Sequence, residues 1–219
     1  MVAFPIAALF AWLAYDAMRV GSAGEIVYDA ATEMATWEAS GAPPGVQTID
    51  WVTADLERAQ RITPGDAQID EMLGQLARRR IDRPDSIDDA LAHFSRAVAL
   101  RPASPYTWAA IVEARYHKGD IGPAFQAALR RAAELGPSEP EVQRTVVDFG
   151  LAAWDEMAPA TRESIEKTIT GAMRRDAAEA LQIAERRGRL AIACRHLADA
   201  PRRAGSEWLT TCRSREATS

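Results

Sequence analysis

Residues 56–64 read LERAQRITP, residues 94–102 read FSRAVALRP, and residues 129–137 read LRRAAELGP. In each copy an apolar residue is followed by alanine three positions on, by isoleucine or leucine after three more, and by proline after a further two. The three closing prolines are 38 and 35 residues apart. Internal similarity at a period of about 34 residues is typical of stacked helix pairs. The pattern predicts an extended surface that holds other molecules, more than an enclosed site for chemistry.

The segments that follow these prolines supply the other helix of each pair. After Pro102 and Pro105, a helix is expected to begin at Trp108, with its buried face continuing at Ile111. Because small, aromatic and proline positions recur together, the chain resembles tetratricopeptide repeats, and the resemblance implies an all-α solenoid of helical hairpins. The chain departs from that pattern in a widened turn at 78–85 and in one extra residue between 124 and 137.

The helical register predicts the roles of three further residues. Gly74 is placed where the two helices of a pair approach most closely, so that a side chain there would overpack the contact. Upstream, Thr48 is expected to cap the start of a helix, because a threonine side chain can accept from the first free N–H groups. Trp51 is expected to pack inward from that helix.

The composition agrees with an all-helical protein. The chain has 219 residues, 47% of them hydrophobic, which is ample for one core and an additional segment. The formal net charge of −5 gives no reason to expect nucleic-acid binding. Almost all of the positive charge is arginine, since Lys118 and Lys167 are the only lysines.

The N-terminal segment is apolar on every side. Residues 1–15 carry no charged side chain, and at about 1.5 Å per residue they cover roughly two-thirds of a hydrocarbon core. Three interpretations remain open: an uncleaved membrane anchor, a signal peptide cleaved after the small residues Gly21-Ser22-Ala23, and a buried first helix. The absence of a polar face between Ala3 and Ala14 favours the anchor. We therefore expect an apolar anchor or signal-like helix at 1–23, repeats at 24–137, and a degenerate C-terminal helical cap at 138–219.

A narrower resemblance to a known family rests on three stretches of sequence in the second half of the chain. The residues that carry it are 127–140 (AALRRAAELGPSEP), 148–155 (DFGLAAWD) and 180–190 (ALQIAERRGRL). Together they resemble the small VpsP-type proteins that are associated with bacterial exopolysaccharide biosynthesis, over Trp51 to Cys212 and more loosely at the apolar start. The resemblance implies an N-terminal membrane segment, a tetratricopeptide-like body and a place in the inner membrane with the body in the periplasm. It implies no reaction.

The only two cysteines, Cys194 and Cys212, lie near the C terminus. They are either two buried thiols or a disulfide that fixes the last segment to the preceding helix. The disulfide would require an oxidising compartment such as the periplasm. Their spacing matches no zinc motif.

Other signals of chemistry are weak. His93, His117 and His196 have no metal-ligand spacing, and no phosphate-binding loop or nucleophile elbow is present. Ser164 and Lys167 match the Ser-x-x-Lys arrangement of certain serine enzymes, but without its partner motifs. The run Arg78-Arg79-Arg80 suits either an anionic polymer or an ordinary polar turn. We expect no catalytic residues, no metal and no cofactor.

The sequence therefore predicts a non-enzymatic, membrane-anchored scaffold for assembly or export of a cell-surface polysaccharide. Its partners would be other membrane or periplasmic proteins and not nucleic acid. The partner groove is expected on the first helices of the pairs, with Tyr106, Glu113 and His117 as contacts. The alternatives are a subunit of a pilus, secretion or cytochrome-biogenesis assembly, and an enzyme that uses Ser164 and Lys167.

Overall fold

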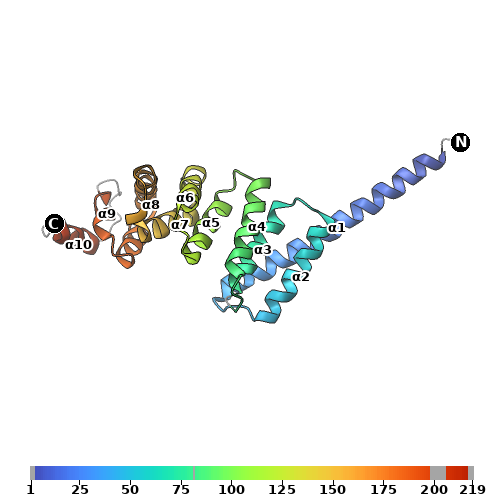
Figure 1. Ribbon diagram of the computed structural model, residues 1–219, viewed down its shortest axis with the longest axis horizontal. Helices are drawn as coiled ribbons and strands as arrows, with labels where there is room; N and C mark the ends of the chain where they lie inside the picture. The colour runs from blue at the N-terminus through green and yellow to red at the C-terminus, as the bar shows by residue number, and fades with distance from the viewer. Residues whose placement is uncertain (1–2, 81, 198–205, 217–219) are drawn as a thin grey trace. The chain divides into compact units, whose positions relative to one another are not determined.

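The computed structural model describes residues 3–80, 82–197 and 206–216, and this part of the chain is helical without strands (Figure 1). The all-α prediction is confirmed. The elements are α1 (Ala3–Ser40), α2 (Val46–Ile62), α3 (Ala67–Arg79), α4 (Ser86–Leu100), α5 (Pro105–Lys118), α6 (Pro123–Leu135), α7 (Pro140–Ala152), the short 3-10 helix η1 (Trp154–Glu156), α8 (Pro159–Arg186), α9 (Leu190–Cys194) and α10 (Ser206–Glu216).

The helices form two compact units that divide between Pro102 and Ala103. The sequence placed its boundaries at 23/24 and 137/138 instead. The first of these lies inside α1, which runs on without a break. The second lies in a packed turn of the second unit, because a Cβ added to Gly136 would come within 2.9 Å of both Pro105 and Val142.

The repeated stretches occupy equivalent places in the two units. Their first and fourth residues are fully buried in all three copies: Leu56, Ala59, Phe94, Ala97, Leu129 and Ala132. The seventh position lies nearer the surface, and Leu100 there is 48% exposed. Burying a large apolar side chain contributes about 1.5–3 kcal/mol, so these positions fix the inward face of α2, α4 and α6.

The first unit is built around the hairpin of α3 and α4, with α2 packed against both α1 and α3. The expectations for the start of α2 were wrong. The helix begins at Val46, with Gly45 and not Thr48 at its N-cap position. Trp51 is 67% exposed, whereas Val52 is buried beside Ile49. The buried face follows the spacing Ile49, Val52, Leu56, Ala59, which leaves Trp51 on the outer side.

The second unit contains two helical hairpins, followed by α9 and α10. Helix α5 pairs with α6, α7 pairs with α8, and the hairpins meet through contacts of α5 with α7 and of α6 with α8. Four consecutive helices begin at a proline, namely Pro105, Pro123, Pro140 and Pro159. Proline suits the first turn because its missing N–H would have no helical partner there. These residues set where each helix starts.

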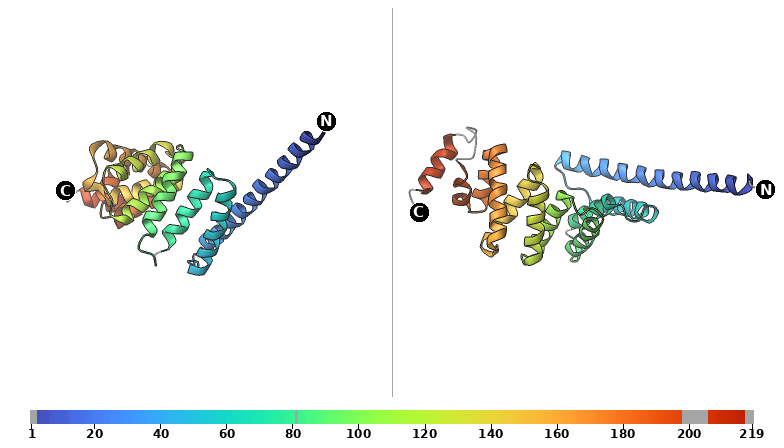
Figure 2. Two further views of the ribbon diagram at one scale, coloured as in Figure 1. Left: turned by 45° about the vertical axis from the view of Figure 1, so that its right-hand side comes forward. Right: turned by 90° about the horizontal axis from the view of Figure 1, so that it is seen from above.

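Helix α1 has two different halves. Its C-terminal half packs on the first unit through Ala30, Met34 and Trp37, whereas Leu9 to Val20 extend beyond α2 and are mostly exposed (Figure 2). The interpretation of the N-terminal segment as a buried first helix is therefore wrong for residues 9–20. The side chains before Leu9 are not among those that the structure describes. Within the described ranges, no helix combines the length and the apolar character that crossing a membrane requires.

Candidate functional site

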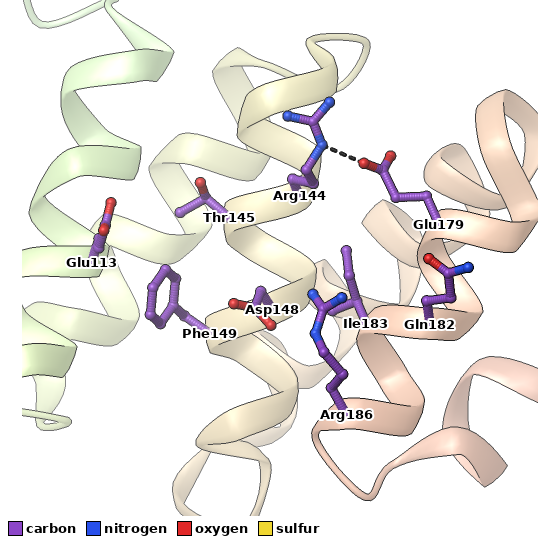
Figure 3. Close-up of a pocket in the computed structure, with 9 residues that line it drawn as sticks. All are labelled: Glu113, Arg144, Thr145, Asp148, Phe149, Glu179, Gln182, Ile183 and Arg186. Atoms are coloured by element: carbon purple, nitrogen blue, oxygen red, sulfur yellow. Dashed lines mark hydrogen bonds and ion pairs between the residues drawn. The ribbon is translucent and has the colours of Figure 1, made fainter. Parts of the chain in front are cut away.

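A groove of about 470 Å³ opens on the second unit along helices α5, α7 and the end of α8 (Figure 3). Helix α7 forms its centre, and α5 and α8 flank it. Helices α5 and α7 are the first helices of their pairs, and the sequence placed its expected partner groove on such helices. The lining residues are Glu113, Arg144, Thr145, Asp148, Phe149, Glu179, Gln182, Ile183 and Arg186.

A break inside α8 creates the third wall of this groove. Asp176 has non-helical backbone angles (φ −151°, ψ 92°), and its carboxylate accepts a hydrogen bond from the N–H of Glu179 at 3.1 Å. This is the geometry of an N-cap, so residues 177–186 start a new helix with its own direction. Helix α8 also contacts α9, which follows it in the chain.

The apolar floor of the groove consists of Phe149 and Ile183, both nearly fully buried. The ring of Phe149 lies 5.0 Å from the ring of Tyr116 and 5.9 Å from that of His117, centroid to centroid. Arg187 lies 5.8 Å above the Phe149 ring. Aromatic contacts of this kind hold the side chains in defined positions, so the floor is already formed in the free protein.

The carboxylates of the α7–α8 wall are paired with arginines. Glu179 accepts from Arg144 at 2.5 Å and from Arg175 at 2.6 Å. Asp148 accepts two hydrogen bonds from Arg187, at 2.8 and 2.7 Å. Partial burial opposes ionisation of Glu179, but the hydrogen bonds from Arg175 and Arg144 outweigh it and lower the pKa of this carboxyl group. The hydrogen bond to Asp148 likewise raises the pKa of Arg187 against the effect of burial.

Three polar side chains of the lining have no side-chain partner among the described residues. In the described part of the chain, Thr145, Gln182 and Arg186 make no side-chain hydrogen bond or ion pair. Gln182 and Arg186 are exposed and Thr145 is partly exposed. Their hydroxyl, amide and guanidinium groups are all donors, so this part of the groove offers hydrogen bonds to a ligand.

The three residues expected in the groove have different positions. Glu113 lines it. His117 lies beside it, 3.8 Å from Glu113 and against Phe149, without lining it. Tyr106, near the start of α5, instead donates to Glu139, a contact that raises the pKa of the phenol. The structure does not bring Tyr106 into this site.

Sequence reasoning missed the α7 and α8 residues of the lining. One signal was available for α8, since Asp176-x-x-Glu179 has the spacing of a capping box and marks the start of a helix. Counting forward from that start places Gln182, Ile183 and Arg186 on one face. No comparable signal marks Arg144 or Asp148.

Ser164 and Lys167 each contact another group of the same helix. The hydroxyl of Ser164 donates to the carbonyl of Ala160 at 3.1 Å, and the ammonium group of Lys167 lies 2.7 Å from Glu163. Both contacts run along the outer surface of α8. Each side chain thus has a partner other than the proposed one.

His93 belongs to a structural cluster around Asp70, which is only 3% exposed. The Asp70 carboxylate lies 3.0 Å from His93 Nδ1 and accepts from Arg96 at 3.0 Å and from Gln60 at 3.1 Å. A buried carboxylate needs such partners to offset its desolvation. The cluster joins α2, α3 and α4 and borders a second pocket of about 480 Å³ next to Leu100.

The arginine run at the end of α3 has partners within its own unit. Arg79 pairs with Glu38 at 3.3 Å, and Arg80 pairs with Asp50 and Asp82. The hydrogen bond to Asp82 raises the pKa of Arg80 and lowers that of Asp82. These contacts fix the wide turn to α1 and α2, which supports the interpretation as a polar turn over that of an anion-binding patch.

The two cysteines form a disulfide. Cys194 and Cys212 are both nearly buried, and their Cα atoms are 5.5 Å apart, within the usual range of 4.4–6.8 Å. The bond joins α9 to α10, and α9 is also the helix that α10 packs against. It thereby holds the last described helix on the second unit.

No family model matches the chain, and no curated protein matches it either. The resemblances to tetratricopeptide repeats and to VpsP-type proteins therefore stay predictions.

Proposed function

We propose that the protein is a non-enzymatic adaptor that holds a segment of a partner protein in the groove of α5, α7 and α8. The observation that carries this proposal is the set of unpartnered donors, Thr145, Gln182 and Arg186, above a formed apolar floor. Helical hairpins commonly bind peptides along their adjacent first helices, because those helices leave one side of each pair free.

The lining of the groove suits a polypeptide. Small-molecule sites are mostly apolar and enclose their ligand, with only a few polar groups. Here seven of the nine lining residues are polar or charged, and an apolar strip of Phe149 and Ile183 lies between them. Alternating apolar and polar contacts are what an extended peptide offers through its own alternating side chains.

We further propose attachment to the bacterial inner membrane through α1, with the helical units in the periplasm. Phe10, Trp12, Leu13 and Tyr15 are exposed around the helix, where lipid or another apolar environment would cover them. Asp16 and Arg19 lie 4.0 Å apart just after this segment, at a place suited to the headgroup region. The disulfide favours an oxidising compartment.

The resemblance to VpsP-type proteins supports a role in assembly or export of a cell-surface polysaccharide. A scaffold in a pilus, secretion or cytochrome-biogenesis assembly would use the same groove and the same apolar helix. The partner distinguishes these roles, since the groove itself has no feature specific to one pathway.

The test is site-specific photo-crosslinking in membranes of the native host. A benzophenone amino acid is placed at Gln182 in the groove and, as a matched control, at Glu134 on the exposed face of α6. We expect a discrete protein adduct from position 182 that position 134 does not give, and a partner mass that belongs to a polysaccharide assembly. Identical products at both positions, or none at either, would contradict an adaptor groove.

A further inference from the structure

The distribution of charge in the groove indicates which chemical group it receives. The lining carries two arginines, Arg144 and Arg186, and three carboxylates, Glu113, Asp148 and Glu179. Two more arginines, Arg175 and Arg187, pair with these carboxylates from outside the lining. Asp148 accepts a hydrogen bond from Arg187, and Glu179 accepts hydrogen bonds from both Arg144 and Arg175. Arg186 is therefore the one lining guanidinium group that has no carboxylate partner among the described residues.

Arg186 is also suitably placed to bind a ligand. It is exposed, it follows Gln182 by one helical turn, and Ile183 beside it supplies part of the apolar floor. An arginine fork donates two parallel hydrogen bonds to a carboxylate, which makes this pair both stronger and more directional than a lysine contact. Gln182, one helical turn before Arg186, can donate to a neighbouring acceptor of the same ligand.

From these contacts we propose that the partner segment presents an acidic side chain, aspartate or glutamate, next to an apolar one. The carboxylate binds Arg186 beside Gln182, and the apolar side chain lies on Phe149 and Ile183. This inference rests on the proposed adaptor function and adds to it the chemistry of the partner.

A selection from a displayed library of random 12-residue peptides tests the proposal. The bait is the full-length protein in detergent, as wild type, as Arg186→Glu and as Arg174→Glu. Arg174 is an exposed arginine of the same helix that does not line the groove, so its reversal changes the net charge equally. Circular dichroism checks that each variant is folded.

We expect peptides selected by the wild type and by Arg174→Glu to share an acidic residue beside an apolar one. A synthetic peptide of that sequence should bind Arg186→Glu at least tenfold more weakly than wild type. Replacing its acidic residue by lysine should reverse this preference. Arg186→Gln gives the intermediate case, in which the attraction is lost without a new repulsion.

The outcomes separate the two proposals. Selected peptides that lack a common acidic residue, or that bind Arg186→Glu as tightly as wild type, overturn the acidic-partner inference and leave the adaptor function standing. A library that yields no binding peptide contradicts both.

Discussion

Gly74 and Phe94 face one another across the α3–α4 hairpin so closely that a Cβ on Gly74 would lie 2.5 Å from Cε1 of Phe94. Phe94 opens the second of the three repeated stretches and is fully buried. The phenyl ring occupies the space that a side chain at position 74 would need. The sequence predicted a close approach at Gly74, and the structure identifies the group that it meets.

Gly74→Leu should lower the free energy of unfolding by about 1–3 kcal/mol, because overpacking exceeds the gain of under about 1 kcal/mol in helix propensity. The measurement is urea unfolding followed by circular dichroism. Gly24→Leu is the control, since nothing lies within 4 Å of a Cβ at Gly24 in the exposed part of α1. An unchanged or raised stability of Gly74→Leu would contradict the packing described here.

Asp176→Ala should loosen the third wall of the groove. Loss of an N-cap side chain costs about 0.5–2 kcal/mol, and here the lost bond is the one to the N–H of Glu179. Hydrogen exchange should accelerate across residues 177–186 more than in α7. Asp176→Asn should behave like wild type, because asparagine caps equally well. Equal exchange in the alanine variant and the wild type would show that the cap is not needed.

Glu179 should make stability depend on pH. Its pKa is lowered in the folded state, so its contribution is present above the unfolded value of about 4.3 and is lost as the pH falls through the lowered pKa. We expect Glu179→Gln to lower the unfolding free energy by about 1 kcal/mol at neutral pH. The difference from wild type should shrink below about pH 4.

Glu185→Gln is the matched control for this titration. Glu185 lies on the same helix, is exposed, and has no ion pair among the described residues. Its substitution should change stability little at any pH. A Glu179→Gln difference that stays constant down to acid pH would contradict the assigned role of Arg144 and Arg175.

The disulfide should stabilise only the C-terminal end of the protein against local unfolding. Cys194 and Cys212 are 18 residues apart in sequence, and closing a loop of that size is worth about 3 kcal/mol in the chain-entropy model. Protein from the native host should show no free thiol. Reduction should increase hydrogen exchange after Arg189 and leave α3 and α4 unchanged. Two free thiols in that native protein would show that the disulfide does not form there. One reason to place the protein in the periplasm would then be lost.

The proposed membrane attachment predicts how the protein fractionates. The full chain should remain with membranes through a carbonate wash, whereas a chain that starts at Gly24 should be recovered in the soluble fraction. The shortened chain should keep its helical content, because Ala30, Met34 and Trp37 still pack. Recovery of the full chain, at its intact mass, in the soluble fraction would contradict the anchor.

The buried positions of the fold were predictable because they follow the helical period. Leu56, Ala59, Phe94 and Ala97 recur at fixed spacing, and all are fully buried. Trp51 was misplaced because its aromatic character was given more weight than this spacing, which puts Val52 inside. The division after Pro102 had no distinct signal, since the stretch that ends there reads like the other two copies.

The groove was only partly predictable. Its location on the first helices follows from hairpin stacking, and Glu113 was found on that ground. The pairing of Arg144 with Glu179 depends on how α7 lies against the second part of α8. That geometry is set by contacts between residues 35 positions apart, which have no local pattern in the sequence.

The continuity of α1 ties the direction of its apolar end to the number of residues. The helix spans 38 residues, about 57 Å, with no interruption between Leu9 and the packed positions that begin at Ala23. Inserting one alanine after Gly21 would rotate everything upstream by about 100° around the helix axis and shift it by about 1.5 Å. A membrane or partner that fixes the orientation of residues 9–20 would therefore also fix the orientation of the helices packed on the C-terminal half of α1.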